Sequence, residues 1–196
     1  MDIQGIIFDM DGTLTVPILD FKRIRHELGV TESNVDLVEV INRRSEAEQR
    51  EAWAVIERHE EIAAANCRFQ PDLDPVLNRF AAAGIRLAVI TRNTRRSADI
   101  VLGRLSVRFG PILTREFPFL KPSPEPVRHI LTEWRLEPRN VLMVGDYIHD
   151  IESGRSAGAY TCYFHDPSLH DSWSGEADFT VSSYNELSAR VLAGYC

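Results

Sequence analysis

Acidic, hydroxyl and amino side chains in this sequence follow short apolar segments, in an arrangement that could bring them into one site. Each of them ends such a segment or lies in a loop beyond it: Asp9, Asp11, Thr91, Lys121, Asp146 and Asp150. Short apolar segments rich in β-branched residues are typical of strands buried in a parallel sheet. In open sheets of this kind, ligands bind outside the carboxyl ends of the strands. We therefore expect these polar groups to converge at one edge of a sheet.

The spacing of the acids indicates a cation site. Asp9 and Asp11 are separated only by Met10, so on extended backbone their side chains point the same way. Two carboxylates so near each other, with Asp146 as a third, cannot all stay ionised without a compensating positive charge. A divalent cation is the natural compensation, and oxygen-only ligands suit Mg²⁺. The sequence therefore predicts a magnesium site at this edge.

The elements that must position these residues alternate along the chain. Strands are expected over residues 3–8, 85–90, 111–113, 141–144, 160–164 and 179–181. Helices are expected over residues 72–83, 94–105, 124–134 and 151–157, with a last helix from about residue 184. Strands that alternate with helices at this pace predict an α/β fold, with a doubly wound, Rossmann-like and mostly parallel sheet.

The segment between the first two expected strands has a different character. Residues 21–67 contain no proline, and helix-forming residues dominate them. We expect two or three helices here, with Gly29 as a stop and Ser33 or Asn34 as the next N-cap. The predicted organisation is an α/β core domain of residues 1–16 and 69–196, with a helical cap domain of residues 17–68 inserted after the first strand.

The net charge, the apolar segments and the cysteine spacing limit the classes of partner that we expect for this protein. The formal net charge of −7 and the pI near 5.4 argue against nucleic acid, whose phosphates need a basic surface. No basic leader, signal peptide or membrane-spanning apolar segment is visible, so we expect no membrane association. The cysteines are scattered, without metal-type spacing, which fits reduced thiols and a cytoplasmic location.

The motifs together resemble one family. DMDGTLT at residues 9–15, VITRN at 89–93, Lys121 directly before Pro122, and GDYIHD at 145–150 occur in that order. They are similar to the four motifs of the haloacid dehalogenase superfamily, and within it to the phosphoglycolate-phosphatase-like branch with a small helical cap. An isolated DxD would carry little weight, whereas four motifs in the expected strand-end or loop context are specific.

The resemblance implies a role for each motif residue. Asp9 would be the nucleophile that forms an aspartyl-phosphate, and Asp11 the general acid and then the general base. Thr91 would hydrogen-bond the transferring phosphoryl group, and Lys121 would offset the charge of the phosphate and of Asp9. Backbone amides around Met10 would cradle the phosphoryl oxygens. The phosphate-binding set would comprise Met10, Asp11, Gly12, Thr91, Arg92, Asn93 and Lys121.

The resemblance also implies the metal ligands. Asp146 would hold Mg²⁺ together with the Asp9 carboxylate and the Asp11 backbone carbonyl. Asp150 would support the metal, through water or by a hydrogen bond to a ligand.

Simpler structural readings compete with these roles. Asp11 could merely form a turn with Gly12, and Lys121 could be a solvated loop lysine. Thr91 could cap the following helix, although Thr94 is equally well placed, and Asp150 could cap a helix that starts at residue 151. One of Arg92 and Asn93 could face the substrate, whereas His149 is not required by the mechanism.

The functional expectation is a magnesium-dependent phosphatase acting on a small phosphorylated metabolite, phosphoglycolate-like or a sugar phosphate. One alternative is a phosphomutase of the same family, which would pass the phosphate back to a sugar and depend on a bisphosphate activator. Another is a non-catalytic phosphate-sensing or scaffold protein on an inherited fold. The complete set of Asp9, Asp11, Thr91, Lys121 and Asp146 speaks against lost catalysis.

Overall fold

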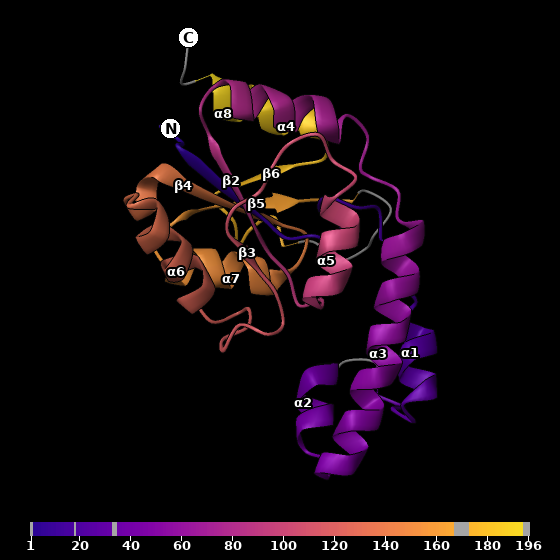
Figure 1. Cartoon of the computed structure of the whole chain (residues 1–196). Helices are drawn as coiled ribbons and strands as arrows, with labels where there is room; N and C mark the ends of the chain where they lie inside the picture. The colour runs from indigo at the N-terminus through magenta and orange to yellow at the C-terminus, as the bar shows by residue number, and fades with distance from the viewer. Residues whose placement is uncertain (1, 18, 33–34, 167–172, 194–196) are drawn as a thin grey trace.

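The computed structural model describes residues 2–17, 19–32, 35–166 and 173–193 (Figure 1). Within these ranges the strands form one six-stranded sheet in the order β3-β2-β1-β4-β5-β6, with every pair parallel. The strands are β1 (Gly5–Phe8), β2 (Arg86–Ile90), β3 (Ile112–Leu113), β4 (Val141–Gly145), β5 (Tyr160–Phe164) and β6 (Phe179–Val181). The predicted doubly wound α/β fold is confirmed.

Helices cover both faces of the sheet. One face packs against α4 (Leu73–Ala82), α5 (Arg95–Leu102) and α8 (Tyr184–Leu192), and the other against α6 (Glu125–Trp134) and α7 (Ile148–Ser156). A short 3-10 helix, η1 (Pro138–Asn140), precedes β4. Buried side chains alternate between the two faces along β1: Ile6 and Phe8 join one apolar cluster and Ile7 joins the other. Burial on both faces explains why the strands are continuously apolar.

Strand register brings the polar segments level with one another. Phe8 is aligned with Val89 on one side and with Val144 on the other. The chain therefore leaves β1, β2 and β4 at the same edge of the sheet. The strand order also reverses direction at β1, so the crevice beside it is the topological switch point where open sheets bind ligands.

The helices α1 (Phe21–Glu27), α2 (Leu37–Asn42) and α3 (Glu46–Asn66) lie apart from the sheet, with α3 leading back toward α5 (Figure 1). They share an apolar cluster of their own, built around Ile24, Ile41 and Ile56. Two backbone hydrogen bonds tie together the chain segments that enter and leave this unit: the Val16 amide donates to the Arg68 carbonyl at 2.8 Å, and the Gln70 amide donates to the Leu14 carbonyl at 3.0 Å. We call α1–α3 the helical insert.

Two helix starts differ from prediction. The N-cap of α2 is Asp36, whose carboxylate accepts a bond from the Val38 amide at 2.7 Å, while Ser33 and Asn34 lie outside the described residues. The α7 helix begins at Ile148 rather than at residue 151. Asp150 is therefore inside the first turn, where its carboxylate accepts from the Tyr147 amide at 3.1 Å. Local capping preference could not distinguish among neighbouring polar residues.

Candidate active site

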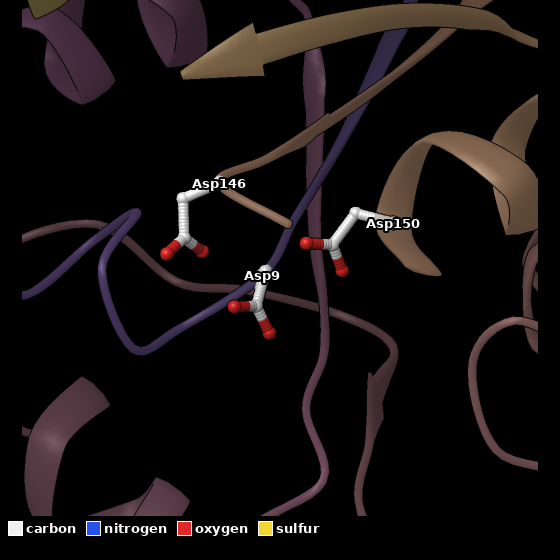
Figure 2. A group of neighbouring side chains, drawn as sticks. All are labelled: Asp9, Asp146 and Asp150. Atoms are coloured by element: carbon white, nitrogen blue, oxygen red, sulfur yellow. The ribbon is translucent and has the colours of Figure 1, made fainter. Parts of the chain in front are cut away.

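Three carboxylates face one another where β1 and β4 end. Asp9 follows β1, and its amide still donates to the Val144 carbonyl of β4 at 2.9 Å. Asp146 follows β4, and Asp150 comes from the first turn of α7. One oxygen of each carboxylate lies within 4.8 Å of the other two, and Figure 2 shows the three side chains around a common space. The acids that the sequence predicted to converge thus lie together.

Lys121 is buried among these acids. Its side chain is only 4% exposed, and its ammonium lies 2.5 Å from Asp9 Oδ1 and 2.6 Å from Asp150 Oδ1. Burial lowers the pKa of Lys121, but the carboxylates of Asp150 and Asp9 outweigh it and raise the pKa above its ordinary value. Lys121 is therefore a fixed positive charge inside the site, not a solvated loop lysine.

One lysine does not balance the acids. Burial, followed by the charges of Asp9 and Asp150, raises the pKa of Asp146 to about 8. Burial and Asp9 also raise the pKa of Asp150 to about 6, against the opposing effect of Lys121. The protein alone thus disfavours full ionisation of these carboxyl groups, and the cluster offers oxygen donors only. These properties fit a hard divalent cation such as Mg²⁺.

Two glycines let the acids approach this closely. A Cβ on Gly12 would lie 2.1 Å from Asp146 Oδ2, and Gly12 has a φ of +82°, in the left-handed region. A Cβ on Gly145 would lie 2.2 Å from the Asp150 Cβ. Thr13 also holds the Asp146 carboxylate, because its hydroxyl donates to Asp146 Oδ1 at 3.2 Å. The glycines are therefore spacers that the carboxylate cluster requires.

Asp11 faces a different partner. The Asn93 side-chain amide donates to Asp11 Oδ2 at 2.7 Å, across 82 positions of sequence. Burial, and then the charge of Asp9, raise the pKa of Asp11 to about 7, although Asn93 and Lys121 act in the opposite direction. A carboxyl group with such a pKa can hold a proton near neutral pH and release it. Asp11 thus makes a long-range contact, and it also precedes a turn through Gly12, in which the Leu14 amide donates to the Met10 carbonyl at 2.9 Å.

The polar residues that follow β2 have different partners. Thr91 is buried, and its hydroxyl oxygen accepts a bond from the Asn93 amide at 3.1 Å. Thr94, not Thr91, is the N-cap of α5, accepting from the Ser97 amide at 3.2 Å. Arg92 forms a two-pronged ion pair with Asp36 of the helical insert, with nitrogen–oxygen distances of 3.0 and 3.2 Å. Its guanidinium is directed toward the insert in this structure.

His149 lies beside this ion pair. Its Nδ1 is buried without a hydrogen-bond partner among the described residues, and its ring meets the Tyr147 ring edge-on at 5.0 Å. Burial, followed by the positive charge of Arg92, lowers the pKa of His149. The ring is therefore mostly neutral near pH 7 and adds no positive charge to the site.

Sequence reasoning missed residues that hold the site from a distance. The Gln70 side-chain amide donates to the Gly12 carbonyl at 3.0 Å, and the Tyr184 hydroxyl donates to the Thr13 carbonyl at 2.9 Å. A buried ion pair joins Glu60 of α3 to Arg115, which follows β3. Thr13 directly follows Gly12, and this position in the sequence could have marked it as a site residue. Gln70, Tyr184 and the Glu60–Arg115 pair are linked to the site only through tertiary structure.

Comparison with known proteins identifies the family. A model of haloacid dehalogenase-like hydrolases matches residues 3–158. The chain belongs to this family. It is 34% identical, over 194 residues, to a haloacid dehalogenase-like hydrolase domain-containing protein of Arabidopsis thaliana, with 92% of this chain and 76% of the plant protein covered. The resemblance inferred from the four motifs is confirmed, and this chain is a haloacid dehalogenase-like hydrolase.

Other relatives carry more specific names. The chain is 26% identical, over 223 residues, to an N-acetylmuramic acid 6-phosphate phosphatase of Pseudomonas putida, with 100% of this chain and 99% of that protein covered. A solved structure described as a predicted phosphoglycolate phosphatase from Haemophilus somnus superposes with a TM-score of 0.77 at 19% identity, covering 95% of this chain and 97% of that one. The structural match confirms the fold. None of the described helices of this hydrolase is long and apolar enough to cross a membrane.

Proposed function

We propose that this hydrolase is a magnesium-dependent phosphatase that releases phosphate from a small phosphomonoester through a phosphorylated Asp9. The observation that carries the proposal is the buried cluster at the switch point. There Asp9 lies 2.5 Å from the Lys121 ammonium and shares a space with two further carboxylates. The family membership and the names of the relatives support the same class of reaction.

In the first step, an Asp9 carboxylate oxygen attacks phosphorus in line with the leaving oxygen. The bond from phosphorus to the leaving oxygen breaks, and Asp11 gives that oxygen its proton, so that an alcohol departs. The raised pKa of Asp11, about 7, supports this role because the carboxyl can carry a proton at neutral pH. Lys121 offsets the charge of Asp9 and of the arriving phosphate.

In the second step, Asp11 takes a proton from water, and the water oxygen attacks phosphorus. The bond between phosphorus and the Asp9 oxygen breaks, which frees phosphate and restores Asp9. Mg²⁺ held by Asp9, Asp146 and the Asp11 backbone carbonyl, with Asp150 in support, would supply positive charge beside the phosphoryl oxygens. The Thr91 hydroxyl and the amides around Met10 and Gly12 are proposed to bind those oxygens.

The helical insert is proposed to act as a cap over this site. It is joined to the core on the site's side by the ion pairs Arg92–Asp36 and Arg115–Glu60. A closed insert would exclude bulk water until the leaving group departs. Residues 17–68 would accordingly be the cap domain, and residues 1–16 and 69–196 the catalytic core. The proposed substrates are phosphoglycolate-like compounds or sugar phosphates.

The test is phosphate release from a panel of phosphomonoesters, with Mg²⁺ or with EDTA, for the wild type and for Asp9→Asn. We expect turnover that requires Mg²⁺ and that falls at least about 10³-fold in Asp9→Asn, because the amide is a poor nucleophile. Asp99→Asn is the matched control, since Asp99 is an exposed carboxylate that pairs only with Arg95 among the described residues. Equal activity in the wild type and Asp9→Asn would remove Asp9 as the nucleophile.

A further inference from the structure

Arg115 is a largely buried arginine that the proposed chemistry does not use. It follows β3, its side chain is 13% exposed, and it lies where the helical insert meets the segment after β2. Burying a guanidinium is costly, so its contacts indicate what it holds. Its Nε and Nη2 have hydrogen-bond partners, whereas Nη1 is buried without one among the described residues.

On the side of the insert, Arg115 is held by α3. Its guanidinium forms an ion pair with Glu60, whose side chain is 6% exposed, and it stacks over the Trp53 ring at 4.6 Å from the ring centre. Both partners belong to α3, and Trp53 also packs against the apolar cluster of the insert. These contacts exist only while α3 is docked.

On the side of the core, Arg115 holds both peptide groups that flank Asn93. Its Nε donates to the Arg92 carbonyl at 3.1 Å, and its backbone amide donates to the Asn93 carbonyl at 3.0 Å. Asn93 in turn donates through its side chain to Asp11 at 2.7 Å. A continuous series of contacts therefore runs from α3 through Arg115 and Asn93 to Asp11.

We propose that Arg115 is a positioning residue that couples docking of the helical insert to the orientation of Asp11. With α3 in place, Trp53 and Glu60 fix the guanidinium, which fixes the peptide groups around Asn93 and directs the Asn93 amide at Asp11. When α3 moves away, Nε loses its support and the Asn93 amide is free to turn from Asp11. The inference rests on the proposed function, in which Asp11 protonates the leaving oxygen.

The dependence on the leaving group separates this role from a merely structural one. Expulsion of an alkoxide requires a proton from a general acid, whereas nitrophenolate is stable enough to leave without one. A misplaced Asp11 should therefore slow alkyl phosphates and spare 4-nitrophenyl phosphate. General damage to the fold or to the phosphate site should slow both equally.

The experiment compares kcat/KM for a simple alkyl phosphate and for 4-nitrophenyl phosphate, because this constant reports only steps up to leaving-group departure. For Arg115→Lys, which keeps the charge but loses Nε, we expect a loss of about 10- to 100-fold with the alkyl phosphate and less than about 3-fold with the aryl phosphate. Trp53→Leu removes the support from α3 without altering Arg115 and should change the ratio in the same direction.

Arg96→Ala is the matched control. Arg96 also joins the core to α3, through Glu61, but this pair is largely exposed and touches neither Asn93 nor Arg92. It should leave the ratio of the two constants unchanged. Equal losses on both substrates in Arg115→Lys and Trp53→Leu, or no loss on either, would overturn the coupling.

A second readout does not need turnover. The side-chain amide resonances of Asn93, followed by ¹⁵N NMR, report its hydrogen bond to Asp11 directly. We expect these resonances to move in Arg115→Lys and to stay in place in Arg96→Ala, and unchanged resonances in Arg115→Lys would refute the proposal. If the wild type hydrolyses no member of the phosphomonoester panel, the proposed function fails, and the NMR comparison still decides whether Arg115 positions Asn93.

Discussion

At the scale of single residues, Gly12 sets how close the backbone after β1 comes to Asp146. Gly12→Ala combines two effects: strain at a φ of +82° and a methyl group 2.1 Å from Asp146 Oδ2. We expect the Asp146 carboxylate to be displaced from the cluster. Apparent Mg²⁺ affinity, measured by titrating activity or by calorimetry, should fall at least about 10-fold, as for lost support of a metal ligand.

Gly84→Ala separates the two effects. Gly84 has a similar φ of +77°, but its Cβ would meet nothing within 4 Å. Both variants should lose about 1 kcal/mol of unfolding free energy from backbone strain, as measured by urea denaturation. Only Gly12→Ala should bind Mg²⁺ more weakly, and equal Mg²⁺ affinity in the two variants would contradict the spacer role.

Lys121 gives a second prediction at this scale. Lys121→Met keeps an unbranched side chain but removes the charge that lies 2.5 Å from Asp9 and 2.6 Å from Asp150. Without it the buried carboxylates repel one another, so the free energy of unfolding in EDTA should fall by about 3–5 kcal/mol. Saturating Mg²⁺ should recover part of this loss, while phosphatase activity stays at least about 10²-fold below the wild type.

The comparison variant is Lys22→Met, because Lys22 lies at an exposed position of α1. It should change neither stability nor activity beyond experimental error. Wild-type stability of Lys121→Met in EDTA would show that the carboxylates do not need this charge.

At the scale of single residues, the sequence predicted the positions of those site residues that directly follow a strand. Asp9, Thr91 and Asp146 could be placed because an apolar segment ends at or just before each of them, and parallel strands end at a common edge. The pairing of Arg115 with Glu60 could not be predicted, because the two residues are 55 positions apart in unrelated elements. The same holds for Arg92, whose ion pair with Asp36 depends on where the insert docks.

At the scale of elements, the docking of α3 buries a titratable group. Burial raises the pKa of Glu60 from its ordinary 4.5 to about 7, with Asp11 acting in the same direction and Arg115 and the Thr94 amide opposing it. The folded state thus binds the Glu60 proton more tightly than the unfolded chain does. Glu60 therefore stabilises the fold most below pH 4.5, and this contribution is lost as pH rises to about 7.

The prediction compares the wild type with Glu60→Gln, which resembles the protonated side chain at every pH. The unfolding free energy of the wild type, relative to the variant, should fall by roughly 3 kcal/mol between pH 4.5 and 7.5 and then level off. Urea denaturation at several pH values measures this difference. A difference that rises with pH would mean that the ion pair with Arg115 outweighs burial.

Elements were predictable in type and less so in their ends and contacts. Continuous apolar character fixed the strands, because a parallel sheet buries both faces, and β5 and β6 begin and end as expected. The α2 start was wrong, since Asp36 takes the cap and also binds Arg92. Local propensity ranks Ser, Asn and Asp alike as N-caps and therefore cannot choose among them.

At the scale of the whole molecule, the candidate cation site joins parts of the chain that are far apart in sequence. Asp9 lies near the N-terminal end, while Asp146 and Asp150 come from the C-terminal half, and the three meet only when β1 and β4 pair. The unfolded chain cannot form this site. A cation that binds there must therefore stabilise the folded state as its concentration increases.

The linkage gives a quantitative expectation. At a Mg²⁺ concentration of about 100 times Kd, the free energy of unfolding should rise by about 2.7 kcal/mol. For a chain of 196 residues this corresponds to a melting temperature about 5–10 °C higher than in EDTA. Asp146→Asn should abolish the increase, because it removes a carboxylate from the cluster, whereas Asp99→Asn should keep it. A similar increase with Na⁺ at matched ionic strength would assign the effect to screening of the buried acids, and a Mg²⁺-specific increase that persists in Asp146→Asn would place the cation elsewhere on the molecule.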